Sequence, residues 1–224
     1  MREIVLDTET TGLDPAAGHR VVELACLELV NHVPTGRHFR EYLNPERPMP
    51  EEAQRIHGLS DTFLAGQPRF AEIVDAFLDF IGDDPLVIHN ADFDIGFLNA
   101  ELRLIGRAEL DAKRATDTVL MARQCFPGAQ ASLDALCRRF EIDNSARSLH
   151  GALLDCELLA EVYLELCGGR QPGLELVKQN AVLAQRLDAP ERPRREPRPH
   201  APTAEELRAH EALLDGLTDP LWRQ

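Results

Sequence analysis

Four acidic residues stand beside apolar segments that lie far apart in this chain. Asp7 and Glu9 follow Ile4–Leu6 in "IVLDTETTGLD", and Asp94 follows the apolar stretch of "LVIHNADFD". Asp155 interrupts the apolar helical face of "HGALLDCELL". Alternate residues of an extended chain point to the same side, so Asp7 and Glu9 should project together from the end of a strand. Carboxylates beside buried segments need a compensating charge, and a divalent cation can supply it.

Four converging carboxylates favour a site for two Mg²⁺ ions, about 3.5–4 Å apart. Such a pair activates a water molecule, holds a phosphate and neutralises the leaving oxygen, so the chemistry indicated is phosphodiester hydrolysis. The competing interpretation is a solvated turn, because 38 of the 224 residues are acidic and a D-x-E pair often arises by chance. The position of the acids beside buried segments favours the metal site.

A base that takes the proton of the water is also expected, and histidine suits this task near neutral pH. His150 precedes Asp155 by five positions, but His89 and His210 also precede an aspartate by five. The spacing therefore leaves His89 and His150 as alternatives. His210 lies in the tail of the chain, where a solvated helix position is the simpler interpretation.

The composition indicates a globular protein of a reducing compartment. Hydrophobic residues make up 44% of the chain, which is enough to form a core. The net charge of −14 argues against a protein that coats duplex nucleic acid through many lysine and arginine contacts. The five cysteines are odd in number and include no C-x-x-C pair, so we expect neither a disulfide framework nor a structural zinc site. Without a signal peptide or an apolar membrane span, the sequence predicts a cytoplasmic protein.

Apolar periodicity predicts an α/β domain in which helices flank a mixed sheet. A meander of strands comes first, and strands then alternate with helices. The expected strands are Ile4–Leu6, Val21–Val30, Phe39–Leu43 and "PLVIHN" at 85–90. The expected helices are Phe70–Ile81, Ile95–Leu104, Val119–Arg123, Leu133–Phe140 with Ser132 as its cap, and Ala152–Leu166, which stops before Gly168 and Gly169.

The composition changes abruptly after residue 188. The segment 189–202, "APERPRREPRPHAP", contains five prolines and four arginines and predicts a flexible, extended linker of about 40 Å. Beyond it, Thr203 and Glu206 match the T-x-x-E capping box. Leucines at 207, 213, 214 and 217 then give a short amphipathic helix, so the tail 203–224 is expected to dock on a partner.

Three segments together resemble the motifs of the DEDDh 3′→5′ exonucleases, which have a ribonuclease H-like fold. They are "DTETTGLD", "HNADFDIGFLNAEL" and "HGALLDCELLAEVYL", in that order. More narrowly, "IHGLSD", "FPGAQASLDALCRRFEIDNS" and the tail "EELRAHEALLD" resemble the proofreading epsilon-subunit family of bacterial DNA polymerase III. The likeness runs nearly end to end. It implies an exonuclease domain over residues 1–170 that removes mispaired nucleotides from the 3′ end of a DNA primer.

The resemblance assigns roles to the acids and settles the choice of base. It implies that Asp7, Glu9 and Asp155 bind two Mg²⁺ or Mn²⁺ ions, with Asp7 bridging both. Asp94 completes the acidic set, directly or through water. His150 becomes the general base.

Further residues are expected around the substrate, which the three metal ligands also contact. The resemblance leaves His89 to shape the pocket with Asn90. Glu52 and His57 match positions that contact the terminal nucleotide, with a loop-stabilising hydrogen bond as the alternative. The threonines at 8, 10 and 11 offer backbone or hydroxyl groups to the substrate, or else cap a turn.

The segments beyond the exonuclease domain imply partners. In the connecting segment 171–188, "QPGLEL" fits a Q-x-x-L-x-[LF] pattern that resembles clamp-binding peptides, through Gln171, Leu174 and Leu176. An ordinary segment after a helix is the alternative. The tail is expected to bind the catalytic (alpha) subunit of the polymerase, and a small accessory subunit is a further candidate partner.

Two other functions compete with proofreading. A free-standing DEDDh DNA or RNA exonuclease would share the catalytic acids but would not need the linker and tail. A non-catalytic binding module could lose any of the acids, so their presence argues against it.

Overall fold

The computed structural model describes residues 1–145, 149–169, 201–218 and 222. It separates into two units, residues 1–174 and 175–224, and each is described by itself. The first unit contains a five-stranded sheet in the order β3-β2-β1-β4-β5. Its strands are β1 (Arg2–Thr10), β2 (Val21–Val30), β3 (Val33–Tyr42), β4 (Leu86–Ile88) and β5 (Ala115–Asp117).

The central strand β1 joins the two halves of the sheet. It pairs antiparallel with β2, which pairs antiparallel with β3. On its other side β1 pairs parallel with β4, and β4 pairs parallel with β5. A mixed sheet in which a meander precedes strand–helix crossovers is therefore confirmed.

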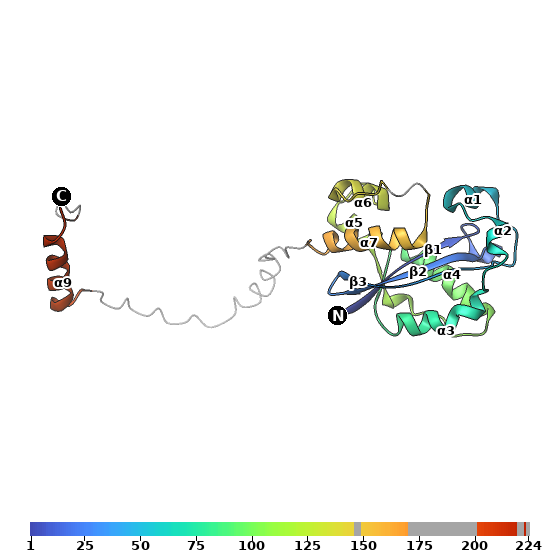
Figure 1. Ribbon diagram of the computed structural model, residues 1–224, viewed down its shortest axis with the longest axis horizontal. Coiled ribbons are helices and arrows are strands. Elements are labelled where there is room, and N and C mark those ends of the chain that lie inside the picture. Colours follow the sequence, from blue (N-terminus) through green and yellow to red (C-terminus); the bar gives the residue numbers. More distant parts are fainter. Residues whose placement is uncertain (146–148, 170–200, 219–221, 223–224) are drawn as a thin grey trace, which may run out of the picture. The chain divides into compact units, whose positions relative to one another are not determined.

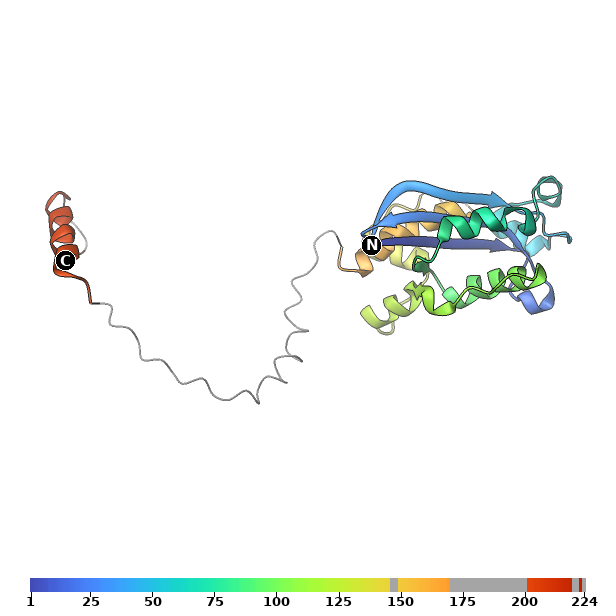
Figure 2. The same cartoon turned by 90° about the horizontal axis from the view of Figure 1, so that it is seen from below.

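Helices cover both faces of this sheet (Figures 1 and 2). One face carries α3 (Phe70–Ile81) and α4 (Ala91–Leu104), and the other carries α5 (Thr118–Cys125), α6 (Leu133–Phe140) and α7 (Ala152–Leu166). The short elements are α1 (Glu51–His57), α2 (Asp61–Leu64) and the 3₁₀ turns η1 (Pro15–Ala17) and η2 (Ala112–Arg114). Burial on both faces explains why β2 and the Ile4–Leu6 portion of β1 are largely apolar.

The alternation of β1 decides which core each side chain joins. Ile4 and Leu6 belong to the core beneath α3 and α4, whereas Val5 belongs to the core beneath α7. Helix α7 packs across β1 and β2, and Cys156 Sγ lies 3.5 Å from the Ala25 carbonyl oxygen. The helix thus seals the face of the sheet toward which odd-numbered β1 residues point.

Helices α3, α6 and α7 begin and end at the predicted residues. Ser132 caps α6 as expected, since its hydroxyl accepts a hydrogen bond of 3.3 Å from the Ala135 amide. Helix α7 ends before Gly168 and Gly169, both of which have positive φ. These elements have strong apolar periodicity together with recognisable end signals.

Other boundaries differ from the sequence predictions. Strand β1 continues to Thr10, so Asp7 and Glu9 lie within the strand rather than beyond its end. Strand β3 begins at Val33 instead of Phe39, because an exposed edge strand carries no apolar alternation to announce it. Helix α4 begins at Ala91 rather than Ile95, which places Asp94 in its first turn. Helices α1 and α2 and strand β5 are too short for periodicity to reveal and were not predicted.

The described part of the second unit contains α9 (Ala204–Asp215). Thr203 and Glu206 form the predicted capping box: the Thr203 amide donates to Glu206 Oε2 at 2.7 Å, and the Glu206 amide donates to the Thr203 hydroxyl. Leu207, Leu213 and Leu217 are exposed within this unit. Most of the predicted linker and the whole "QPGLEL" segment, with Gln171, Leu174 and Leu176, lie outside the described residues. Within the described ranges, the helices are all too short or too polar to cross a membrane.

Candidate active site

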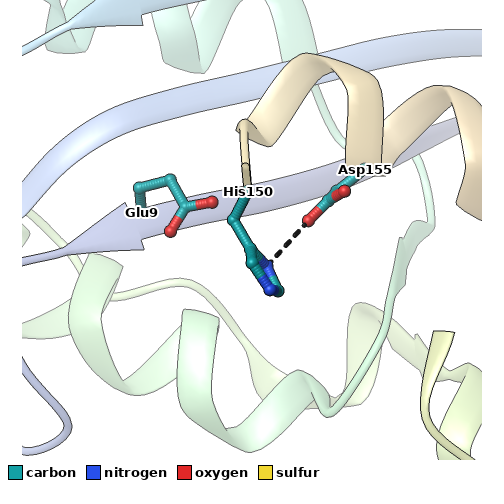
Figure 3. A group of neighbouring side chains, drawn as sticks. All are labelled: Glu9, His150 and Asp155. Atoms are coloured by element: carbon teal, nitrogen blue, oxygen red, sulfur yellow. Dashed lines mark ion pairs between the residues drawn. The ribbon is translucent and has the colours of Figure 1, made fainter. Parts of the chain in front are cut away.

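Strand β1 and helix α7 bring together two of the predicted acids and a histidine. Glu9, His150 and Asp155 each present a ligand atom, and these atoms lie within 4.8 Å of one another. Figure 3 shows Glu9 on β1, His150 just before α7 and Asp155 on the first turn of that helix. His150 Nδ1 lies 3.4 Å from Asp155 Oδ2. Residues from the two ends of the first unit therefore meet over one face of the sheet.

The acids and the histidine differ in their access to solvent. Glu9 is 8% exposed and Asp155 is 5% exposed. The side chain of His150 is 48% exposed. A half-exposed imidazole can exchange protons with solvent, while the carboxylates beside it are sheltered.

Asp94 joins the site from the opposite face of the sheet. Its side chain is 3% exposed, and Asp94 Oδ1 accepts hydrogen bonds from the Thr8 amide at 2.9 Å and the Thr8 hydroxyl at 2.7 Å. Asp7 lies next to Thr8 in β1 and is only partly exposed. The start of α4 is thus bonded to the strand that carries Asp7 and Glu9.

The carboxylates of this site share an unfavourable electrostatic environment. Burial raises the pKa of Glu9 to about 8, and the Asp155 charge adds to the shift although His150 opposes it. Burial raises the pKa of Asp94 to about 7, against the hydrogen bonds from Thr8. The pKa of Asp7 is raised well above its usual value by burial and then by the charges of Asp94 and Asp155. Added positive charge would relieve this repulsion.

This donor set fits divalent cations. Hard cations such as Mg²⁺ and Mn²⁺ prefer oxygen ligands, and buried carboxylates with raised pKa values supply oxygens whose charge is not yet compensated. Glu9 and Asp155, which lie together with His150, could hold such an ion. Asp7 is not part of this group of ligand atoms, but the charges of Asp94 and Asp155 act on it. The competing interpretation placed the D-x-E pair in a solvated turn. It is wrong for Glu9, which is buried.

A cleft of about 630 Å³ opens beside these residues. Its walls are the end of β1 with the turn that follows, helix α1, Phe93 of α4, and His150. Glu52 and His57 of α1 both line it, as do the threonines at 8, 10 and 11. Its size is that of pockets that enclose small ligands.

His57 is the buried histidine of this cleft. It is 6% exposed, and its Nδ1 accepts a hydrogen bond of 3.1 Å from the Leu59 amide. Its Nε2 makes no hydrogen bond with any described residue. Burial lowers the pKa of His57, although the Thr10 backbone opposes the shift. His57 therefore stabilises its loop through one ring nitrogen and retains the other for a further contact.

The structure separates the two histidines between which the spacing could not choose. His150 lies beside Glu9 and Asp155, whereas His89 Nδ1 lies 2.9 Å from the Thr118 hydroxyl. With Asn90, His89 lines a different cavity of about 500 Å³. The structure thus places His150, and not His89, in the group with Glu9 and Asp155.

Two features that shape the site were not predicted from the sequence. Asp117 caps α5 by accepting a 2.7 Å hydrogen bond from the Val119 amide, and it also accepts one from the Ala91 amide at the start of α4. An aspartate before a helical segment is a recognisable capping signal. His19 lies so close to Gly12 that a Cβ atom at Gly12 would come within 2.4 Å of its ring, a contact that no local pattern announces.

Comparisons with known proteins agree on one family. The family model described as Exonuclease matches residues 4–163. The chain is 58% identical over 186 residues to the DNA polymerase III subunit epsilon of Rickettsia conorii, covering 82% of this chain and 81% of that protein. It is 45% identical over 227 residues to the DNA polymerase III subunit epsilon of Escherichia coli K12, covering 96% and 92% of the two chains.

Solved structures show the same fold at low sequence identity. The nuclease domain of 3′hExo, a DEDDh family member bound to rAMP, has a TM-score of 0.65 at 16% identity, with 74% of this chain and 90% of that chain covered. Exonuclease X in complex with 5′ overhanging duplex DNA has a TM-score of 0.59 at 24% identity, with the same coverage of 74% and 90%. The ribonuclease H-like fold predicted from the motifs is confirmed.

Proposed function

Since this chain belongs to the exonuclease family and, within it, to the DNA polymerase III epsilon subunits, we propose that it proofreads DNA replication as a 3′→5′ exonuclease. The reaction is hydrolysis of the terminal phosphodiester of a mispaired primer, which releases a 5′-mononucleotide. The observation that carries this proposal is the meeting of Glu9, His150 and Asp155 beside a cleft large enough for a nucleotide.

The acids of β1 and α7 hold the cofactor in this proposal. Asp7, Glu9 and Asp155 bind two divalent cations, Mg²⁺ or Mn²⁺, and Asp94 stabilises the arrangement through its bonds to Thr8. When bound, such ions activate water and neutralise the charge that develops on the phosphate and the leaving oxygen. The carboxylates are preorganised because they are fixed by a buried strand and a packed helix.

His150 acts as the general base. Its half-exposed ring can take the proton of the attacking water and release it to solvent. Asp155 Oδ2, 3.4 Å from His150 Nδ1, orients the ring. In this proposal Asp155 both binds a metal ion and orients His150.

The cleft holds the terminal nucleotide. Glu52 on α1 accepts hydrogen bonds from the sugar, and His57 uses the ring nitrogen that has no hydrogen bond to a described residue. A frayed 3′ end enters more readily than a paired one, since unpairing costs least at a mismatch. This provides part of the selectivity for errors.

The second unit tethers the nuclease to the replication machinery. Four arginines and two glutamates give the linker 189–202 a charge of +2. Because the whole chain carries −14, the remainder carries −16. Such an acidic body binds DNA weakly by itself. Docking of α9 on the catalytic (alpha) subunit raises the local concentration of nuclease at the primer end toward the millimolar range. A cytoplasmic location follows from this partnership.

Two further partners belong to the same proposal. Gln171, Leu174 and Leu176 of "QPGLEL" bind the sliding clamp, and a small accessory subunit binds the nuclease unit. Replacing Gln171 and Leu176 by alanine should weaken clamp binding in a pull-down. An unchanged pull-down would contradict clamp binding through this segment.

One experiment tests the function as a whole. A primer with a 3′ mismatch is digested by the full chain and by a chain that ends at residue 189, each with and without the polymerase catalytic subunit. We expect the catalytic subunit to accelerate digestion by the full chain only. Equal acceleration of the truncated chain would exclude tethering through the tail, and lack of digestion by either chain would exclude the exonuclease.

A further inference from the structure

A further buried acid faces the active site from the neighbouring strand. Glu23 of β2 is 1% exposed and lies directly opposite Glu9 in the antiparallel pairing of β1 and β2. Residues directly opposite each other in such a pair project from the same face of the sheet. Glu23 therefore points toward α7, beside a proposed metal ligand, although nothing in the proposed mechanism uses it.

Two hydrogen bonds occupy the two oxygens of Glu23. Arg40 Nε on β3 donates to Oε1 at 2.8 Å, and the Ala152 amide at the start of α7 donates to Oε2 at 3.3 Å. The arginine compensates the buried charge. The same carboxylate therefore connects an edge strand of the sheet to the first residue of the helix, 129 positions away in sequence.

The start of α7 needs a cap from elsewhere. Its N-cap residue is Gly151, which has no side chain to accept hydrogen bonds from the first amides of the helix. Unsatisfied amides at a helix N-terminus favour a negatively charged acceptor. Glu23 supplies that acceptor from β2, so the sheet itself caps the helix.

The capped turn is the one that carries the chemistry. His150 precedes Ala152 by two residues, and Asp155 closes the first helical hydrogen bond by donating its amide to the Gly151 carbonyl at 2.9 Å. On the other side, the His150 amide donates to the Ile56 carbonyl at 3.1 Å. Two hydrogen bonds thus hold the segment 150–155 in place, one to the Ile56 carbonyl and one to Glu23 on the sheet.

We infer that Glu23 is a positioning residue for the reaction: by capping α7 it fixes His150 and Asp155 relative to Glu9. This inference rests on the proposed exonuclease function. Partners that orient metal ligands and catalytic groups typically change activity about 10–100-fold when they are replaced. Glu23 does not line the substrate cleft, so its loss should lower kcat and leave KM nearly unchanged.

Glu28 offers a matched control on the same strand. It is also a buried glutamate, 4% exposed, and its side-chain partners within the described part of the chain are Arg2, Thr35 and Arg37. None of these lies in α7 or lines the cleft. Glu28→Ala therefore removes a buried acid paired with arginine without uncapping the helix.

The experiment compares Glu23→Ala, Glu23→Gln and Glu28→Ala in the full chain. Release of mononucleotides from a mismatched primer in Mg²⁺ gives kcat and KM, and amide hydrogen exchange without metal reports on residues 152–155. For Glu23→Ala we expect kcat to fall about 10–100-fold, KM to change less than about twofold, and these amides to exchange faster. Glu23→Gln keeps the side-chain volume and one acceptor oxygen, so its kcat should lie between those of Glu23→Ala and the unmodified protein. Glu28→Ala should keep the unmodified kcat and the slow exchange of the α7 amides.

Three results would overturn the inference. The first is a Glu23→Ala protein with kcat within twofold of the unmodified one, and the second is an equal loss of kcat in Glu28→Ala. The third is unchanged exchange at residues 152–155. If Glu23→Ala does not fold, Glu23→Gln decides, and a kcat within twofold of the unmodified protein then refutes the role. An unmodified chain that releases no mononucleotide refutes the proposed function itself, while the exchange data still test the cap.

Discussion

Buried acids occur in two kinds of surroundings in this protein. Glu28 and Glu101 are each paired with arginine: Arg2 and Arg37 donate to Glu28, and Arg20 donates to both oxygens of Glu101 at 2.7 Å. The hydrogen bond from Arg2 holds the pKa of Glu28 below its usual value. In the active site, by contrast, burial raises the pKa of Glu9 to about 8.

The two sets of buried acids differ in whether the protein supplies a compensating positive charge, and this difference separates structural carboxylates from active-site carboxylates. Where the carboxylate has a structural task, the fold provides a cation of its own, and the pair stabilises the native state. Where the carboxylates crowd against one another, the missing cation must come from solution. Uncompensated repulsion among carboxylates, in a fold that pairs Glu28 and Glu101 with arginine, is therefore the physical sign of the active site.

The strongest way to break this comparison is Asp7→Asn. Loss of a proposed bridging ligand should reduce mononucleotide release at least about 10³-fold, equivalent to several kcal/mol of transition-state stabilisation. Because the substitution also removes a repelling charge, the metal-free protein should melt no lower than the unmodified one. Mononucleotide release and thermal unfolding in chelator measure the two effects. Activity within tenfold of the unmodified chain would contradict the assignment of Asp7.

His150→Ala tests the base rather than the acids. Removal of a general base should lower kcat about 10²-fold, with the metal ligands left in place. His89→Ala is the control, because His89 contacts Thr118 and lines a separate cavity. Equal losses in the two variants would show that the ring beside Asp155 is not the base.

Glu28→Ala probes the arginine-paired set. It leaves Arg2 and Arg37 without their acid, and since both arginines are partly exposed we expect a loss of about 1–2 kcal/mol in the free energy of unfolding. The melting temperature should fall by about 4 °C while kcat is unchanged. Thermal unfolding followed by circular dichroism provides the measurement. Asp7→Asn and Glu28→Ala should thus affect activity and stability in opposite ways.

The pH dependence of metal-free stability gives the smallest expected effect. Between pH 6 and 8, Glu9 and Asp94 lose protons in the native state, whereas both are already ionised when the chain is unfolded. The native state therefore binds more protons, and its stability falls as pH rises through this range. We therefore expect a lower melting temperature in chelator at pH 8 than at pH 6. Mg²⁺ should remove most of the difference, and a stability that rises with pH in chelator would contradict the raised pKa values.

Much of the fold follows from local patterns in the sequence. The periodic apolar faces of α3, α6 and α7 are strong enough to fix both ends of each helix. Two of the four predicted acids, Glu9 and Asp155, lie close together with His150, because Glu9 of β1 projects from the face of the sheet that α7 covers. Short elements such as α1 and β5 carry too few residues for a period to appear, and tertiary contacts determine them.

The surroundings of the acids could not be predicted in the same way. The cap that Glu23 gives to Ala152 joins residues whose side-chain types suggest nothing about each other. The spacing of His150 and His89 was equally uninformative. Their places in the fold distinguish them, since His150 lies just before α7 and His89 follows β4. Such contacts depend on register and on the path of the chain between elements, which residue spacing does not encode.

The packing of α7 on β1 and β2 also has a consequence for synthesis. The last helix of the described part of the first unit completes a site that begins with the first strand, so the contacts involved are among the most distant in sequence. Closing the long intervening loop carries an entropic cost, and folds rich in such distant contacts form slowly. A ribosome-bound chain that lacks α7 has neither Asp155 nor His150, so hydrolytic activity cannot precede translation of nearly the whole unit.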